Sequence, residues 1–213
     1  MVSRIHGLIL QMWFLITAPF QRDLITDTAR SIYQIDFASL KKQGVSLVIF
    51  DLDDTLAHWR ASISQEVMSF LNSLHNDIGM SIAILTNSTM ARGKKIKKTL
   101  DLDHVVIMQT PTKPLTGGYI KILLHYNTPA DKTAMIGDRL ATDMWGAKRA
   151  GIKTRILVEP CSNHMQNYSS FFVQKLIRAL ERTLYGNLFF AVRNNKKKSE
   201  QNSKNEDRNT LKR

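Results

Sequence analysis

Cysteine is nearly absent from this sequence. Its one cysteine, Cys161, cannot form an internal disulfide or a zinc site built from several thiolates, and it is compatible with a reducing compartment. Acidic residues are scarce as well, because 18 Asp and Glu stand against 30 Lys and Arg, which gives a formal net charge of +12. This excess predicts attraction to polyanions, whether nucleic acid, anionic lipid or phosphorylated substrates.

No apolar stretch reaches the roughly 20 residues that a bilayer-spanning helix needs. The longest, residues 5–20, is nearly all apolar, begins after Arg4 and is followed by Arg22. We therefore expect residues 1–22 to be an apolar N-terminal segment. Three interpretations stay open: an anchor at a membrane surface, a targeting segment, or a helix that packs on the domain. No small-residue cleavage site supports secretion.

Other familiar patterns are missing too. The sequence contains no Walker-type Gly-rich loop, no Ser-His-Asp arrangement and no internal repeat, and its histidines lack the spacing of metal ligands. The basic runs at 92–98 and 196–198 are not interleaved with aromatic residues. We therefore expect no specific nucleic-acid partner. Lys94 to Lys98 are most simply a solvated helix face, with a phosphate-binding patch as the alternative.

Apolar strand patterns alternate with amphipathic helix patterns through the middle of the chain. We expect strands at 45–50, 81–85, 105–108, 133–136 and 154–158, and helices at 64–79, around 92–98, and at 117–126 and 144–150. This alternation predicts an α/β fold with a doubly wound parallel sheet.

The domain boundaries follow from composition. At 213 residues, 43% apolar and 23% charged, the chain is expected to form one globular domain over residues 23–190, closed by a helix at 166–184. Residues 191–213 carry a basic excess without apolar periodicity. They are expected to form a disordered tail, because they cannot bury enough apolar surface to offset the entropy of ordering.

The densest chemical signal follows the first expected strand, which ends in Asp51, Asp53 and Asp54. Carboxylates this close repel one another and shift toward protonation unless a cation lies among them. Oxygen ligands favour a hard ion, so the pattern indicates Mg²⁺.

Three later strand ends also carry polar groups: Thr86 with Asn87, then Lys113, then Asp138 with Asp143. The carboxyl ends of parallel strands meet at one edge of a sheet, where ligands bind, so we expect these residues to converge. A hydroxyl, a fixed cation and an acidic wall suit phosphoryl transfer, which needs positioning and charge neutralisation. Each of these motifs, taken alone, is also typical of a turn or a helix cap. Because the four motifs occur in this order and each lies at a strand end, together they favour a phosphoryl-transfer site.

The spacing Asp51-x-Asp53-x-Thr55, followed by the three later motifs, resembles the haloacid dehalogenase (HAD) superfamily of aspartate-nucleophile phosphatases. The resemblance implies that Asp51 attacks phosphorus and forms an aspartyl-phosphate. It also implies that Asp53 protonates the leaving alkoxide and later takes a proton from the attacking water.

The same resemblance assigns the remaining residues. Thr86, Asn87 and Lys113 are implied to bind the phosphoryl group or offset its charge. Asp138 is implied to complete the Mg²⁺ shell with Asp51 and the main-chain carbonyl of Asp53. Asp143 either binds the metal through water or orients Lys113, and the sequence leaves both roles open.

Over about residues 19–184 the chain resembles one capless branch of that superfamily, the phosphatidylglycerophosphate phosphatases of bacteria and mitochondria. The segments between motifs leave no room for a cap domain. The residues that carry this resemblance are Ser31 to Asp36, Leu40 to Gly44, Trp59, Lys113-Pro114, Gly137 to Asp143, Gly151, and Ile156 to Pro160. The branch usually has Asn at position 54, Ser-Asn-Asn at 86–88 and Gln at 139, where this chain differs.

The branch implies a reaction and a location. The reaction is hydrolysis of phosphatidylglycerophosphate to phosphatidylglycerol and phosphate, which precedes cardiolipin synthesis. The expected partners are a phospholipid substrate and an anionic membrane surface, at the cytoplasmic face of a bacterial membrane or the matrix side of the mitochondrial inner membrane. The alternative is a soluble HAD phosphatase acting on a small phosphate ester or a polynucleotide 3′-phosphate.

Overall fold

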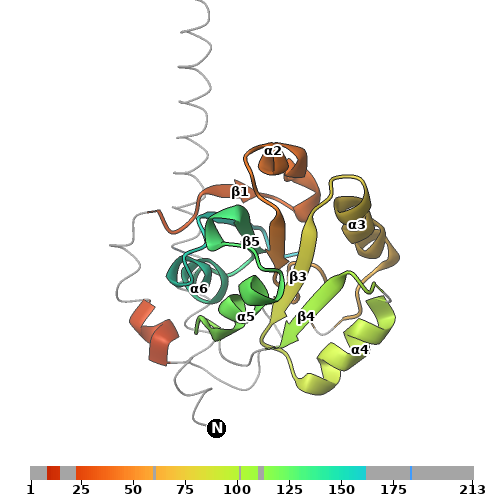
Figure 1. Cartoon of the computed structure of the whole chain (residues 1–213). Helices are drawn as coiled ribbons and strands as arrows, with labels where there is room; N and C mark the ends of the chain where they lie inside the picture. Colours follow the sequence, from red (N-terminus) through yellow and green to blue (C-terminus); the bar gives the residue numbers. More distant parts are fainter. Residues whose placement is uncertain are drawn as a thin grey trace, which may run out of the picture.

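The apolar strand patterns come together in one six-stranded parallel sheet (Figure 1). The computed structural model describes residues 9–14, 23–59, 61–100, 102–109, 113–161 and 183. Its strands are β1 (Asp27–Ala29), β2 (Leu47–Phe50), β3 (Ser81–Thr86), β4 (Val105–Gln109), β5 (Thr133–Gly137) and β6 (Thr154–Val158). They lie in the order β1-β6-β5-β2-β3-β4, which confirms the predicted doubly wound α/β fold.

The strand order reverses between β2 and β5. From β2 the chain builds β3 and β4 on one side, then returns to build β5 and β6 on the other. A reversal of this kind leaves a crevice at the carboxyl ends of the two central strands, which is where open α/β sheets bind ligands.

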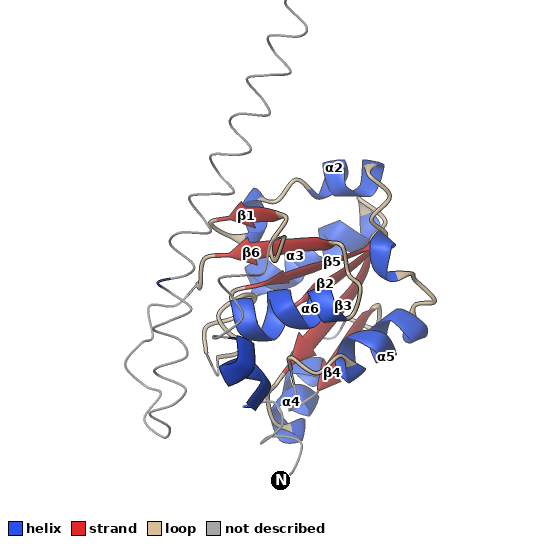
Figure 2. Ribbon diagram, turned by 90° about the vertical axis from the view of Figure 1, so that its left-hand side faces the viewer, coloured by secondary structure: helices blue, strands red, loops and turns tan. Residues whose placement is uncertain are grey.

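Helices cover both faces of the sheet (Figure 2). The α-helices are α2 (Phe37–Lys42), α3 (Gln65–Asn76), α4 (Met90–Leu100), α5 (Gly117–His125) and α6 (Trp145–Arg149). The short turns are η2 (Ile32–Gln34), η3 (Ala130–Lys132) and η4 (Leu140–Met144), of which η4 is a π-helix.

Strand β2 is buried on both faces because a layer of helices lies on each side. Val48 and Phe50 belong to the core shared with α2, α3 and α4, whereas Leu47 and Ile49 belong to the core shared with α5 and α6. All four side chains are 0% exposed, as the uninterrupted apolar run predicts for a central parallel strand.

Two elements differ from the sequence-based expectation. Strand β1 was not predicted, because three half-buried residues give no periodicity; it exists through its pairing with β6, with Asp27 opposite Ile156. The helix predicted at 144–150 is shorter than expected, because a π-turn at Leu140–Met144 precedes α6. Asp143 therefore lies within the π-turn rather than at the start of a helix.

The connections between strands consist of the helices that the sheet requires. Helix α3 links β2 to β3, α4 links β3 to β4, and α5 links β4 to β5. The described residues accordingly include no cap domain, as predicted.

Part of the apolar N-terminal segment is described. Residues 9–14 are helical, and Phe14 is fully buried with its ring centroid 5.4 Å from that of Trp145. Ile9, Met12 and Trp13 are instead 56%, 50% and 58% exposed. This short helix therefore packs through one side and presents apolar groups on the other.

Among the described residues, no helix has both the length and the apolar character needed to cross a bilayer. The predicted closing helix at 166–184, Thr183 excepted, and the predicted tail at 191–213 lie outside the described part of the chain.

Candidate active site

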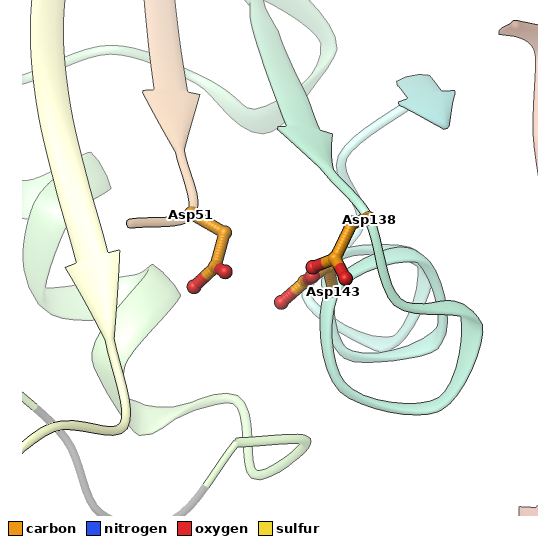
Figure 3. Close-up of side chains that lie close together, drawn as sticks. All are labelled: Asp51, Asp138 and Asp143. Carbon is orange, nitrogen blue, oxygen red and sulfur yellow. The ribbon is translucent and has the colours of Figure 1, made fainter. Parts of the chain in front are cut away.

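Three carboxylates meet at the carboxyl ends of the two central strands. Asp51 directly follows β2, Asp138 directly follows β5, and Asp143 belongs to the π-turn η4. Figure 3 shows their side chains turned toward a common space. One oxygen from each lies within 4.8 Å of the others, and all three residues are at most 7% exposed. The predicted convergence of these acids is therefore present in the fold.

A single buried ammonium group bridges two of the three acids. Lys113 Nζ donates to Asp51 Oδ1 at 2.5 Å, to Asp143 Oδ1 at 2.8 Å and to the carbonyl oxygen of Leu85 at 3.0 Å. These three bonds use all three donors of the ammonium group. Lys113 thus lies beside the predicted nucleophile, and Asp143 orients it, as one of the two predicted roles for Asp143 requires.

The cluster perturbs the pKa values of its members. Burial raises the pKa of Asp51 to about 7; the charge of Lys113 opposes this rise and the charge of Asp143 adds to it. For Lys113, burial lowers the pKa, but Asp143 and Asp51 together outweigh it, so the pKa is raised. Lys113 is consequently a permanent cation, while Asp51 takes up a proton more readily than an exposed aspartate does.

The donor set fits a divalent metal ion. The three buried carboxylates outnumber the one ammonium by two charges, and each offers an oxygen to the same small volume. An excess of two buried negative charges is costly unless a cation compensates it. Carboxylate oxygens are also the ligands that hard divalent ions prefer. Asp51, Asp138 and Asp143 are therefore the residues that would hold the metal.

Comparison with known proteins agrees with this site. The family model described as mitochondrial PGP phosphatase matches residues 21–162, a segment that contains every predicted site residue. The chain belongs to that family. It is accordingly a phosphoric monoester hydrolase of the HAD type, with the buried aspartate triad as its acidic centre.

The curated relatives of this phosphatase are distant. The probable phosphatase YqeG of Bacillus subtilis is 26% identical over 73% of this chain and 85% of its own length. Phosphatidylglycerophosphate phosphatase 1 of Arabidopsis thaliana, chloroplastic/mitochondrial, is 25% identical over 74% of this chain. The chain spans 45% of the Arabidopsis protein and 57% of its Chlamydomonas reinhardtii counterpart, which is 22% identical.

Among solved structures, a hypothetical protein from Xanthomonas campestris matches with 18% identity and a TM-score of 0.43. The match covers 59% of this chain and 71% of that protein. A 3-deoxy-D-manno-octulosonate 8-phosphate phosphatase from Moraxella catarrhalis, solved with magnesium, phosphate and KDO, covers 57% of this chain and 80% of its own. Its identity is 16% and its TM-score 0.37.

In this phosphatase, Asp53 lies apart from the acid triad. Its Oδ1 is 2.8 Å from Arg92 Nη1, and the second arm of that guanidinium donates to the carbonyl oxygen of Ala61 at 3.1 Å. The sequence places Arg92 on a basic helix but does not predict this ion pair. The only available signal was position, since Arg92 lies in the first turn of the helix that follows Thr86.

Thr86 and Asn87 end β3 beside the cluster. Thr86 is buried, and its Oγ1 accepts a hydrogen bond from the backbone N–H of Ser88 at 3.1 Å. Asn87 holds the backbone of Lys113, because its Oδ1 accepts from the Lys113 N–H at 2.9 Å and its Nδ2 donates to the Lys113 carbonyl at 3.4 Å. Direct contact between Asn87 and the phosphoryl group stays a prediction.

Two further residues support the site: Tyr119, which the sequence did not single out, and Gly137, which belongs to the motif Gly137 to Asp143 named above. Tyr119, fully buried on α5, donates from its hydroxyl to the carbonyl of Thr142 at 2.8 Å and lies 3.3 Å from that of Asp143. Gly137 leaves room for Asp143, because a Cβ at position 137 would lie 2.5 Å from Asp143 Oδ2. Both residues fix the π-turn that aims Asp143 at Lys113.

Proposed function

We propose that this enzyme is a Mg²⁺-dependent phosphatase that removes the terminal phosphate of phosphatidylglycerophosphate through an aspartyl-phosphate on Asp51. The observation that carries the proposal is the placement of Asp51: a buried carboxylate at the end of the central strand, bonded to Lys113 and flanked by Asp138 and Asp143. Membership of the family and the relatives named for phosphatidylglycerophosphate support the substrate.

The first half-reaction transfers the phosphoryl group to the protein. A carboxylate oxygen of Asp51 attacks phosphorus, and the bond from phosphorus to the glycerol oxygen breaks. Asp53 gives its proton to the departing alkoxide, so phosphatidylglycerol leaves as a neutral alcohol at that oxygen. Lys113 offsets the charge of the nucleophile and of the transferring oxygens, while Thr86 donates a hydrogen bond to one of them.

The second half-reaction restores the enzyme. Asp53, now a carboxylate, takes a proton from water as the water oxygen attacks the aspartyl-phosphate. The bond from phosphorus to the Asp51 oxygen breaks, inorganic phosphate leaves, and Asp51 is again a carboxylate. Asp51, Asp138 and Asp143, with the main-chain carbonyl of Asp53, would hold Mg²⁺, which would neutralise charge on the phosphoryl group when bound.

The open edge of the site suits a substrate embedded in a membrane. Trp145, against which Phe14 packs, follows Asp143 by two residues, and the helix at 9–14 lies toward the edge where the strand arrowheads end (Figure 1). Its exposed Met12 and Trp13 are groups that favour the membrane interface. With the net positive charge, they support docking on an anionic membrane, at the cytoplasmic face in bacteria or the matrix face in mitochondria.

The reaction is tested by phosphate release from phosphatidylglycerophosphate, glyceraldehyde 3-phosphate, a sugar phosphate and 3′-phosphorylated DNA, each with and without Mg²⁺. We expect the lipid to have the highest kcat/KM and Asp51→Asn to lower it at least about a thousandfold. The control is Asp131→Asn, an exposed acid in η3 at the opposite edge of the sheet, which should retain full activity. Preference for another phosphate ester would refute the substrate, and normal turnover by Asp51→Asn would refute the mechanism.

Membrane docking is tested by sedimentation with two kinds of vesicle. Anionic vesicles contain phosphatidylglycerol, and neutral vesicles contain only phosphatidylcholine. Replacing Met12 and Trp13 by Ser should weaken binding to the anionic vesicles several-fold while activity on a soluble substrate persists. Leu124→Ser is the matched control, because Leu124 is 75% exposed near the end of α5, where the chain returns to the other edge of the sheet. Equal binding of both variants would contradict docking through the helix at 9–14.

A further inference from the structure

The ion pair between Arg92 and Asp53 stands outside the chemistry derived so far. Asp53 must reach the leaving oxygen of the substrate, yet its Oδ1 lies 2.8 Å from Arg92 Nη1. The side chains of Arg92 and Asp53 are 15% and 21% exposed, so the pair lies at the rim of the site, where a ligand can reach it. A pair this accessible to water is weak enough to exchange partners.

A small hollow lies directly beside this pair. It has a volume of about 30 Å³ and is lined by the backbone stretch Ala61 to Ile63 and by Arg92, Lys95, Ile96 and Thr99 of α4. Two of these residues are cationic, two carry hydroxyl groups, and no acid lines the hollow. A cationic, hydroxyl-bearing hollow favours a phosphate or another compact anion.

Helix α4 is basic as a whole. It carries Arg92 and the exposed lysines at 94, 95, 97 and 98, and it contains no acidic residue. An anion in the hollow would therefore meet an uninterrupted positive field from the helix. Arg92 is the member of this set that also contacts the predicted acid and base.

We propose that Arg92 and Lys95 form a subsite for a second anionic group of the substrate, the phosphodiester next to the scissile phosphate. The inference rests on the proposed function, because phosphatidylglycerophosphate carries a phosphodiester separated from its terminal phosphate by one three-carbon glycerol unit. When the diester occupies the hollow, the Arg92 guanidinium exchanges Asp53 for a phosphate oxygen. Asp53 is then released to turn toward the leaving oxygen.

This arrangement couples recognition to catalysis. A substrate that carries the second anion both gains contacts with Arg92 and Lys95 and frees Asp53. A simple phosphomonoester does neither. Arg92 is thus a specificity-determining and positioning residue, whose loss should affect substrates unequally.

The test compares Arg92→Gln with wild type on short-chain phosphatidylglycerophosphate and on p-nitrophenyl phosphate. The second substrate has no additional anion, and its leaving group needs little help from an acid. We expect the ratio of the two kcat/KM values to fall at least tenfold, chiefly through a higher KM for the lipid. Arg92→Lys keeps the positive charge but loses the planar guanidinium that binds phosphate through two hydrogen bonds, so it should recover part of the ratio.

A product analogue probes the subsite without chemistry. Short-chain phosphatidylglycerol keeps the diester but lacks the terminal phosphate. Its inhibition constant should therefore be at least tenfold lower for the wild-type enzyme than for the Arg92→Gln enzyme. Short-chain diacylglycerol, which has the same acyl chains but no phosphodiester, should affect wild type and Arg92→Gln equally. Lys94→Gln is the matched control, because this exposed residue of the same helix points roughly 200° away from Arg92 and should behave as wild type.

The outcomes separate this inference from the proposed function. Suppose that wild type prefers the lipid, but that Arg92→Gln lowers kcat/KM equally for both substrates or leaves both values unchanged. The subsite is then refuted and the proposed function stands. If wild type does not hydrolyse the lipid while p-nitrophenyl phosphate is turned over, both are refuted.

Discussion

At the scale of single residues, Lys113 decides whether three buried acids can coexist. Its side chain is 2% exposed and bonds both Asp51 and Asp143. Replacing it by Met leaves the carboxylates without their cation, so we expect the free energy of unfolding without metal to fall by about 3–5 kcal/mol and kcat to fall at least about a hundredfold.

Urea unfolding of Lys113→Met with and without Mg²⁺ checks this expectation, with the exposed Lys132→Met as control. The metal should recover part of the lost stability, because it supplies positive charge to the same oxygens. Equal stability of the variant and wild type in the absence of metal would contradict the role given to Lys113.

Asn87 is predicted from the sequence to bind the phosphoryl group, and the structure gives it a second role, holding the backbone of Lys113. Because its side chain bonds both backbone groups of Lys113, we expect Asn87→Ala to lower kcat about tenfold while KM changes little. Asn87→Asp, which keeps an acceptor for the Lys113 N–H, should lose less. Steady-state kinetics decide: a raised KM with an unchanged kcat would instead mean that Asn87 binds the substrate directly.

At the scale of elements, the π-turn η4 is what brings Asp143 into the site. The turn depends on Gly137, since a methyl group there would lie 2.8 Å from the Asp143 Cβ and Cγ atoms. We expect Gly137→Ala to lower the free energy of unfolding by about 1–3 kcal/mol, as overpacking does, and to lower Mg²⁺ affinity as well.

Thermal unfolding and metal titration measure both effects of Gly137→Ala. Gly117→Ala is the matched control, because a Cβ there meets nothing within 4 Å and Ala favours a helix over Gly. This control should be as stable as wild type or slightly more so. A Gly137→Ala protein that keeps full stability and metal affinity would show that η4 can move aside.

At the scale of the whole molecule, metal binding and protonation are linked. Burial raises the pKa of Asp51 to about 7 in the metal-free protein, against the opposing charge of Lys113, so this carboxyl binds a proton more readily than an exposed aspartate does. A metal binds the deprotonated form, so we expect binding near pH 7 to release protons and the affinity to fall as the pH drops below 7.

Titration calorimetry in buffers of different ionisation enthalpy measures that release, with Asp51→Asn as the variant that should lose this contribution. The metal affinity must fall as the pH falls, because the carboxylates take up protons that the metal has to displace. An affinity that stays constant between pH 6 and pH 8 would rule out Asp51 as the linked group.

Some parts of the fold and of the active site could be predicted from the sequence, and others could not. The five strands β2 to β6 were predicted, and so were the acids that follow β2 and β5, because Asp51 and Asp138 are covalently next to long apolar runs typical of buried strands. Strand β1 could not be predicted, since its three residues become a strand only by pairing with β6. Asn87 was predicted as a site residue, but its bonds to Lys113 depend on how two separate loops meet.

The sequence by itself determined the order of strands along the chain, the residues at their ends and the charge of the molecule, because these are properties of neighbours along the backbone. Only the tertiary structure decided that Arg92 pairs with Asp53, that Tyr119 contacts η4, and that Lys113 bonds both Asp51 after β2 and Asp143 in η4. Those contacts join residues far apart in sequence. They therefore depend on how the helices pack against the sheet, which no local pattern specifies.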